Sequence, residues 1–417
     1  MNHYNAGTAL SAHERDLCME TLQLAGQLIM EYGGETFRVE ETITRMGSAV
    51  GLTEVESFAV PSGIFISYRM QDGERLSSVK RVRLKGTDLS RVDEVNRISR
   101  HVEAGEMTLA MAHTALVKVR DQAVSNWLSP LAWGVCAGGF TMMFGGGLPE
   151  IGVSFLLSAL ARLLTLLLDR FHWQEMISTL LSAFLCTFPP MLAVQWFPAL
   201  QTEATIAGAL MPMLSGLVMT GAVQDTLRGD MVSGLTHGVR ALLTAALVAG
   251  GALLAAAAAR PAAGGAELNL LELSWWAAAI SSFAGTLGFA LICRAPLRSC
   301  VPASLIGTAA YMLYWWLCRL GLSEIAAVFC GTLLGTLLGM VCAREMRMIG
   351  TVFLMMSIVS FVPGLGLYRG MRYFGDSMTR LGAEQIIYAM GIIAMIVLGQ
   401  AIGSFLFRAV FRQRRHS

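Results

Sequence analysis

Two apolar stretches decide the fold: residues 130–147 read PLAWGVCAGGFTMMFGGG, and residues 150–168 read EIGVSFLLSALARLLTLLL. A stretch of about 18 or more apolar residues is long enough to cross a hydrocarbon core of roughly 30 Å. Similar stretches follow at 176–196, 204–223, 232–258, 272–293, 300–318, 323–342, 349–368 and 384–407. The sequence therefore predicts a polytopic α-helical membrane protein with about ten transmembrane helices.

Residues 1–125 have a different composition. They hold 31 of the chain's 60 charged side chains, including all three lysines. The whole chain is 54% hydrophobic and has a mean hydropathy of +0.57, which is too apolar for an ordinary soluble protein. Its net charge of +2 favours neither a nucleic acid nor an acidic partner. No signal peptide is recognisable before the charged region, so we expect a cytoplasmic front domain.

The front region has the pattern of a small α+β domain. Helical periodicity predicts helices at 14–31, through Val39, Ile43 and Met46 to an end near Gly51, from Thr87 onward and at about 106–125. Short β-type runs predict strands at 55–60, 64–70 and 76–84. Asp72-Gly73 between the last two runs is a strong hairpin signal.

Arginine distribution predicts the orientation of the membrane part. An even number of spans puts both chain ends on one side, which we expect to be the cytoplasm of the cytoplasmic (inner) membrane. The connectors and tail on that side carry Arg170, Arg228, Arg294, Arg298, Arg344, Arg347, Arg408, Arg412, Arg414 and Arg415. The opposite connectors carry only Arg260, Arg319, Arg369, Arg372 and Arg380. This bias follows the positive-inside rule.

The spans divide into two sets of five around the linker at 260–266. The expected domains are 1–125, 126–260 and 261–417. A five-helix repeat enters the membrane from the opposite side the second time, so homologous halves would form an inverted pair. A weak internal match favours this: Ser215-Gly216 in span four and Pro363-Gly364 in span nine both precede an Arg-Gly pair. A chance division into five and five is the alternative.

Several motifs resemble the threonine/serine exporter family. They are GETFRVEETI at 34–43, PSGIF at 61–65 and the glycine elements of spans four and nine. The resemblance covers nearly the whole chain, with both family modules fused. It implies export of threonine and serine, or of dicarboxylates such as succinate, as associated with some two-chain members. It also singles out five front-domain residues: Thr36, Arg38, Glu40, Pro61 and Gly63.

Interrupted helices are the candidate transport site. Freed backbone groups cannot be left unpaired in lipid, so a broken helix must line a polar site or be buried. In span nine the candidates are Pro363, Gly364, Gly366 and Arg369. In span four they are Pro212, Ser215 and Gly216, where the family usually has Pro-Gly. The alternative interpretation is a packing kink.

Charged residues at membrane depth are further candidates. Arg162 and Arg240 could capture a substrate carboxylate; alternatively they reach the headgroups or pair with Asp169 or Asp230. The end of span four supplies Asp225, Arg228 and Asp230. Its aspartates could carry a coupling proton or cap a helix, and His237 could relay protons or make an interfacial hydrogen bond.

Other motifs have structural interpretations. Thr36 with Glu35 or Glu40 could cap a helix rather than bind a ligand. Ser62 is expected in a turn. The spacings Gly331…Gly335…Gly339 and Gly399…Gly403 predict close helix packing.

The function expected from these observations is secondary-active transport. No P-loop, nucleophile elbow or zinc-binding helix is present, so neither ATP hydrolysis nor another enzymatic activity, nor any cofactor or metal, is expected. The expected protein is a proton-coupled threonine/serine exporter that alternates access around spans four and nine. A dicarboxylate exporter, a membrane-anchored sensor or enzyme, and a channel remain alternatives. The expected partners are a small-molecule substrate and the lipid bilayer, with a homo-oligomer left open.

Overall fold

The computed structural model describes residues 12–70, 73–123, 126–214, 216–259, 273–361, 364–375 and 377–413. The chain forms two compact units. The first comprises Met1–Val124 with Cys293–Pro296, and the second comprises Ser125–Ile292 with Leu297–Ser417. The linker at 260–272 lies outside the described residues, so the expected limits of the two membrane modules stay predictions.

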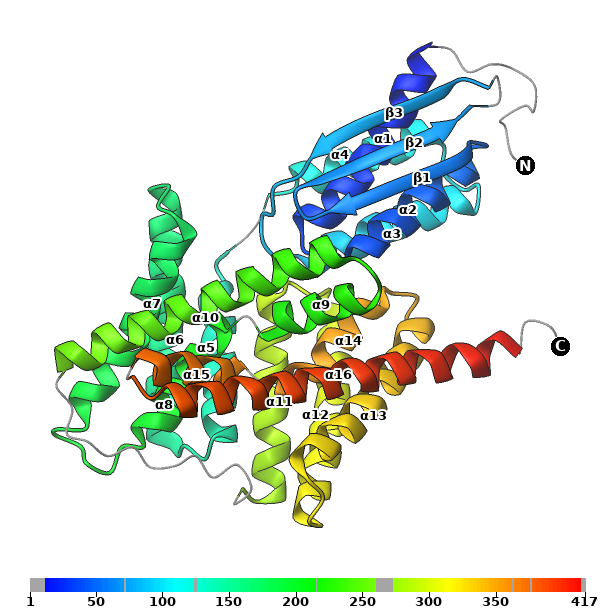
Figure 1. Ribbon diagram of the computed structural model, residues 1–417. Helices are drawn as coiled ribbons and strands as arrows, with labels where there is room; N and C mark the ends of the chain where they lie inside the picture. The colour runs from blue at the N-terminus through cyan, green and yellow to red at the C-terminus, as the bar shows by residue number, and fades with distance from the viewer. Residues whose placement is uncertain are drawn as a thin grey trace. The chain divides into compact units, whose positions relative to one another are not determined.

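The first unit places helices against one face of a three-stranded sheet (Figure 1). Its helices are α1 (Ala12–Glu31), α2 (Thr36–Ala49), α3 (Leu89–Glu103) and α4 (Leu109–Asp121). Its strands are β1 (Thr53–Val60), β2 (Gly63–Arg69) and β3 (Arg75–Arg81), antiparallel in the order β1-β2-β3. These are the three strands expected from sequence, with Pro61 and Ser62 in the first turn and Gly73 at φ +88° in the second.

Alternation along the strands separates a buried face from an exposed one. Ile64, Ile66 and Tyr68 of β2 are buried, whereas Phe65 between them is 45% exposed. This period of two is what a sheet covered on one side requires. The helices contribute the rest of the core through Leu22, Leu28, Ile29, Ile43, Met46 and Leu89.

A glycine pair fixes the turn between α1 and α2. Gly33 has φ +80°, a left-handed conformation that glycine adopts readily. A Cβ on Gly34 would lie 2.4 Å from Ile29 Cγ2 and 2.8 Å from the Ile29 carbonyl oxygen. Neither position tolerates a side chain, which explains the sharp stop of α1.

Four residues distant in sequence belong to the first unit. Leu89 N–H and Ser90 N–H, at the start of α3, donate to the carbonyls of Cys293 and Arg294, both at 3.0 Å. Asp88 accepts from Arg91 N–H at 3.2 Å and lies 3.5 Å from the Arg294 guanidinium. The loop 293–296 therefore satisfies donors that a helix N-terminus leaves unpaired.

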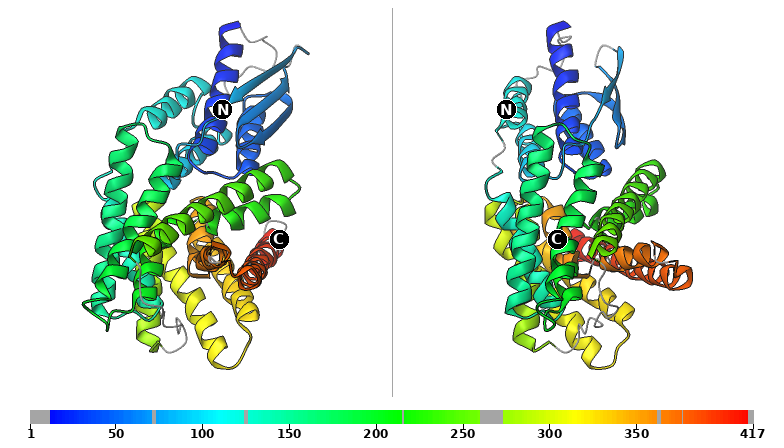
Figure 2. Two further views of the ribbon diagram at one scale, coloured as in Figure 1. Left: turned by 60° about the vertical axis from the view of Figure 1, so that its left-hand side comes forward. Right: turned by 90° about the vertical axis from the view of Figure 1, so that its left-hand side faces the viewer.

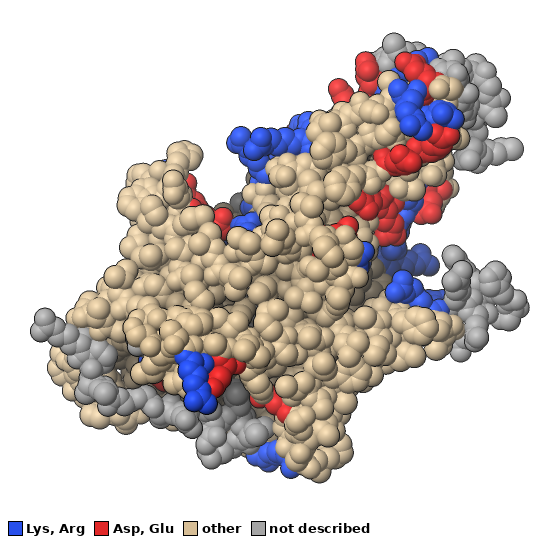
Figure 3. Space-filling model, viewed as in Figure 1, with Lys and Arg blue, Asp and Glu red and all other residues tan. Residues whose placement is uncertain are grey.

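The second unit is entirely helical over its described residues. Its helices are α5 (Ser129–Met143), α6 (Leu148–Arg170), α7 (Glu175–Ala193), α8 (Thr202–Leu210), α9 (Gly216–Leu227), α10 (Met231–Ala259), α11 (Trp275–Ile292), α12 (Leu297–Arg319), α13 (Glu324–Glu345), α14 (Gly350–Ile358), α15 (Gly364–Gly375) and α16 (Thr379–Gln413), with 3₁₀ turns η1 (Met211–Met213) and η2 (Val359–Phe361). Leucines 156, 160, 163 and 167 form an exposed apolar stripe on α6. Figure 3 shows charged side chains concentrated on the first unit and a largely uncharged surface on this one. These features identify a multi-pass membrane unit.

The number of spans differs from the sequence prediction. Seven continuous helices, α6, α7, α10, α11, α12, α13 and α16, are long and apolar enough to cross a bilayer. Two bent pairs, α8 with α9 and α14 with α15, bring the total to as many as nine in the described chain. The remaining expected span, 130–147, forms α5, whose 15 residues rise only about 22 Å. The count of ten stays a prediction.

The two helical sets repeat in length and spacing. α8 and α14 have nine residues each, η1 and η2 three each, and α9 and α15 twelve each. The second set begins 148 residues after the first: α8 at Thr202 and α14 at Gly350, α9 at Gly216 and α15 at Gly364, α10 at Met231 and α16 at Thr379. Contacts are reciprocal, since α10 packs on α15 and α16 packs on α9, while α5 packs on its counterpart α11 (Figures 1 and 2).

Small residues mediate the closest helix crossings, as their spacing predicted. A Cβ on Gly139 would lie 2.3 Å from Gly285 N, where α5 crosses α11. Gly335 on α13 faces Ser357 of α14, and Gly403 on α16 faces Thr336 of α13, each with less than 3.0 Å for an added Cβ. Close backbone approach of this kind compensates for the weak hydrophobic drive between helices in lipid.

Candidate functional site

Two helix interruptions face each other in the membrane unit. The pair α8–η1 and α9 bends by 53°, and the pair α14–η2 and α15 bends by 48°. Leu214, the last described residue before the first break, has extended backbone with ψ 125°. A Cβ on Gly364, the first residue of α15, would lie only 2.9 Å from Leu214 Cβ. The interruptions expected in spans four and nine are therefore present and adjacent.

The arrangement at the breaks puts helix N-termini next to each other. α9 begins at Gly216 and α15 begins at Gly364, so the first N–H groups of both helices lie at the interruptions. Pro212 lies within η1 and is half-buried, as is Gly366 in the first turn of α15. The sequence candidates Ser215 and Pro363 lie outside the described residues, and their roles stay predictions.

A buried and a half-buried hydroxyl group accompany the second interruption. Ser360 of η2 lies 3.4 Å from the hydroxyl of Thr286 on α11, and either group can donate. A Cβ on Gly307 would approach both Thr286 and the Met356 carbonyl oxygen, at 3.0 and 2.7 Å. Helices α11, α12 and α14 thus meet tightly beside a polar pair, one turn before the break.

An ion-pair cluster joins the two broken helices at one end. Arg369 Nη2 lies 3.0 Å from Glu203 Oε2, and Arg372 Nη1 lies 3.2 Å from Glu203 Oε1. Glu203 opens α8, while both arginines belong to α15, so the cluster links the first half of one broken helix to the second half of the other. Sequence reasoning selected Arg369 but missed Glu203 and Arg372.

The opposite end of the first broken helix carries a carboxylate–imidazole pair. Asp225 on α9 is 5% exposed and lies 3.1 Å from His237 Nδ1 on α10. At the preceding residue, the Gln224 side-chain amide donates to Gln400 Oε1 on α16, and Gln400 donates to the Leu354 carbonyl at 3.3 Å. A buried carboxylate beside an imidazole can exchange a proton between two defined partners.

Other charged candidates lie outside these clusters. Arg162 donates to Ser129 Oγ at 2.7 Å and lies over the Trp133 ring. Arg240 contacts Glu175 at 3.0 Å, so the expected pairing with Asp169 or Asp230 is wrong for this residue.

The loop after α9 holds the remaining candidates. Arg228 is exposed, and Asp230 precedes α10, where its carbonyl accepts from Gly234 N–H at 2.9 Å. Asp230 therefore occupies the capping position, one of the two roles considered for it.

The front-domain motif serves the fold of the first unit. The N-cap of α2 is Glu35, which makes no side-chain capping hydrogen bond, and Thr36 is already helical and buried. The capping interpretation is therefore wrong in detail. Glu40 instead accepts from Ala59 N–H of β1 at 3.0 Å, which ties helix to sheet. Gly63 opens β2, where a Cβ would lie 3.3 Å from the Lys80 carbonyl oxygen.

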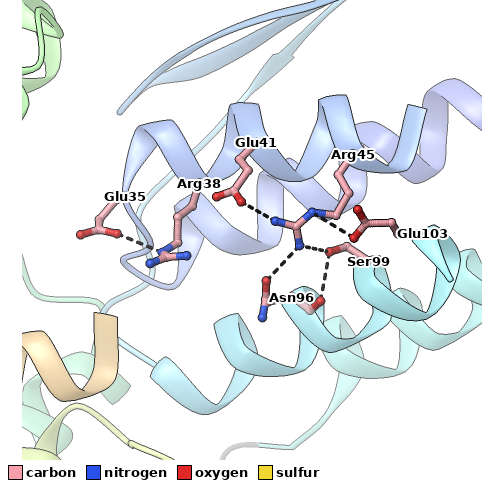
Figure 4. Close-up of polar contacts among 7 residues, drawn as sticks. All are labelled: Glu35, Arg38, Glu41, Arg45, Asn96, Ser99 and Glu103. Atoms are coloured by element: carbon pink, nitrogen blue, oxygen red, sulfur yellow. Dashed lines mark hydrogen bonds and ion pairs between the residues drawn. The ribbon is translucent and has the colours of Figure 1, made fainter. Parts of the chain in front are cut away.

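Arginines on α2 organise the adjoining surface (Figure 4). Arg38 pairs with Glu35 at 3.0 Å, and Arg45 pairs with Glu41 on the same helix. Arg45 also reaches α3, at 3.4 Å from Asn96 Oδ1, 3.3 Å from Ser99 Oγ and 3.6 Å from Glu103 Oε2. This network fastens α2 to α3. In the described part of the chain, no three His, Cys, Asp or Glu side chains could hold a metal ion.

Comparison with known proteins identifies the family. A model for threonine/serine exporters matches residues 20–259, and a second, described as "Threonine/Serine exporter, ThrE", matches residues 278–406. The first model alone covers more than half of the chain. The chain belongs to the threonine/serine exporter family. It is a membrane transporter, not an enzyme.

Relatives within the family carry two kinds of name. The chain is 24% identical over 409 residues to a "Threonine/serine exporter" of Corynebacterium glutamicum. The alignment covers 94% of this chain and 82% of the relative. It is 26% identical over 233 residues to the "Probable succinate transporter subunit YjjP" of Escherichia coli K12. This alignment covers 55% of this chain and 89% of the relative. A homologous subunit of Klebsiella aerogenes is 28% identical over 221 residues. No solved structure matches the chain.

Proposed function

We propose that this protein is a secondary-active exporter of threonine and serine that alternates access around its two broken helices. The observation that carries the proposal is the contact between the breaks, where Gly364 has no room for a side chain beside Leu214. Two interrupted helices that meet at one point can open toward either side in turn while the site between them stays fixed. The exporter relative that matches 94% of the chain supports this substrate class.

The helix ends at the breaks suit a zwitterion. The N-termini of α9 and α15 carry unpaired N–H groups and the positive ends of helix dipoles, which favour a carboxylate. The carbonyls released at the ends of η1 and η2 add hydrogen-bond acceptors for an ammonium group but no opposite charge. A threonine or serine molecule would use both sets, with its hydroxyl among the neighbouring hydroxyl groups of Thr286 and Ser360.

We further propose that the two helical sets form an inverted repeat. The equal element lengths, the constant spacing of 148 residues and the reciprocal contacts of α10 with α15 and α16 with α9 support this. The arginine distribution supports cytoplasmic termini in the cytoplasmic (inner) membrane.

Asp225 and His237 are the proposed proton site. Asp225 is the buried carboxylate at the end of a broken helix, and its partner His237 lies on the neighbouring helix α10. Bending of α9 relative to α10 would change the distance between these two groups, and so the affinity of the pair for a proton. Proton binding and the opening of one side would then be coupled.

Dicarboxylate export is the second candidate. The succinate transporter subunits match the first half of this chain, and Arg369 and Arg372 are suitable partners for a second carboxylate. Counterflow in proteoliposomes distinguishes the candidates: vesicles preloaded with unlabelled threonine should accumulate labelled threonine, and vesicles preloaded with succinate should not accumulate labelled succinate. The reverse result would favour the dicarboxylate, and no counterflow of either would refute both.

A further inference from the structure

One carboxylate of the membrane unit has an unusual set of partners. Glu324, the first residue of α13, accepts hydrogen bonds from two tyrosines: from Tyr314 Oη on α12 at 3.2 Å, and from Tyr388 Oη on α16. Among the described residues, no Lys, Arg or His forms an ion pair with it. In contrast, Glu203, Glu175 and Glu384 each pair with an arginine.

Neutral donors orient this carboxylate without neutralising its charge. A partly buried carboxylate in a membrane protein gains most from a cation held close by. The position of Glu324 in the first turn of α13 gives only the modest stabilisation of a helix N-terminus. Glu150 shows what a structural carboxylate looks like in this unit. It accepts a hydrogen bond from the Gln201 backbone N–H and so fixes the start of α8.

Aromatic rings connect Glu324 to the second helix break. The Tyr314 ring lies 5.5 Å from the ring of Phe361, and Tyr311 lies 6.3 Å from it. Phe361 is the last described residue before the break and is buried. Aromatic faces attract a cation electrostatically, most strongly where water is excluded. The next residue on α12, Trp315, is also buried, and its indole N–H has no hydrogen-bond partner among the described residues.

We propose that Glu324, with the hydroxyls of Tyr314 and Tyr388, binds the ammonium group of the transported amino acid. This rests on the proposed function and makes it specific, because the carboxylate attracts a primary ammonium ion and repels a dicarboxylate. The site accordingly selects zwitterionic amino acids over succinate.

Glu324→Gln and Glu384→Gln form a matched pair of variants for the test. Both remove one carboxylate charge, but Glu384 lies on α16 one turn before Tyr388 and is paired with Arg380 at 2.9 Å on an exposed surface. In proteoliposome counterflow, Glu324→Gln should raise the KM for threonine about 10- to 100-fold, as expected for loss of a charge-assisted contact. Glu384→Gln should keep the wild-type KM. An unchanged KM in the Glu324→Gln protein would overturn the proposal.

Competition in the wild-type protein tests the site without a mutation. Threonine should inhibit labelled threonine counterflow at least about 10-fold more strongly than N-acetylthreonine, which lacks the ammonium charge. Equal inhibition would overturn the ammonium site even if Glu324→Gln failed to insert. A wild-type protein without any threonine counterflow would instead refute the proposed function itself.

Discussion

Gly364→Ala tests the contact between the breaks. The added Cβ would lie 2.9 Å from Leu214 Cβ, 3.4 Å from its Cδ1 and 3.7 Å from its Cγ. Carbon atoms settle at about 3.5 to 4.0 Å, so the two broken helices would have to move apart by roughly 0.6 Å or more. Overpacking of this kind costs about 1 to 3 kcal/mol.

Gly364→Ala should therefore destabilise, by this amount, any transport state in which the two breaks stay in contact. An energy of about 1 to 3 kcal/mol changes an equilibrium roughly 5- to 150-fold. We therefore expect threonine counterflow by Gly364→Ala, measured per inserted molecule in proteoliposomes, to fall by at least about fivefold. Gly221→Ala on α9 is the control, because a Cβ there meets nothing within 4 Å.

A second-site change identifies the colliding atom. Leu214→Ala keeps its Cβ, so it should not restore counterflow to Gly364→Ala. Leu214→Gly removes that atom and should restore part of the activity. Wild-type counterflow by Gly364→Ala, with normal thermal stability in detergent, would show that the contact between the breaks has no part in transport.

Three further predictions concern separate groups. Cross-linking of Glu203→Cys to Arg372→Cys with a reducible bifunctional thiol reagent should stop counterflow and reduction should restore it, because the ion pair joins two broken helices that separate in the proposed cycle; full counterflow after complete cross-linking would contradict this role. Asp225→Asn should abolish threonine export driven by a pH gradient but keep threonine exchange, whereas unimpaired gradient-driven export would remove Asp225 as the proton site. Burial raises the pKa of the Cys18 thiol to about 11, so at pH 7 only about one thiol in 10⁴ is ionised, and N-ethylmaleimide should label it only after unfolding. Rapid labelling of the folded protein would contradict this.

Local chemistry made much of the fold predictable. Apolar stretches longer than the bilayer core predict membrane helices, because lipid leaves no other backbone conformation satisfied. The glycine elements at 215–216 and 363–364 correctly predicted where two helices are interrupted. Asp72-Gly73 predicted the hairpin between β2 and β3, because such a dipeptide favours a tight reversal between two strands, and the strands pair up to Arg69 and Arg75.

Partners distant in sequence were not predictable. Glu203 and Arg369 are 166 residues apart, and Glu324 and Tyr388 are 64 apart, so no local pattern connects them. The pairing expected for Arg240 was wrong for the same reason, because its partner Glu175 begins a helix two spans earlier. The capping interpretation of Thr36 failed because the helix begins one residue sooner than the Gly-Gly turn suggested.

Comparing matching positions of the two helical sets indicates which residues to test for a role in transport. With a spacing of 148 residues, Gly216 corresponds to Gly364, which both open a helix at a break. The charged candidate residues break the correspondence: Glu203 has Thr351 as its counterpart, and Arg369 has Gly221. The glycine that opens the helix after each break is thus shared between the two sets, whereas the charged pairs at their ends are not. If the two sets form a symmetric scaffold, it can open toward either side of the membrane with equal ease. Coupling requires that the ends of the two broken helices differ chemically, so that one opening step involves a proton site and the other an ion pair. The positions at which the two halves differ are therefore the ones whose substitution should change coupling and selectivity while leaving the helical framework intact.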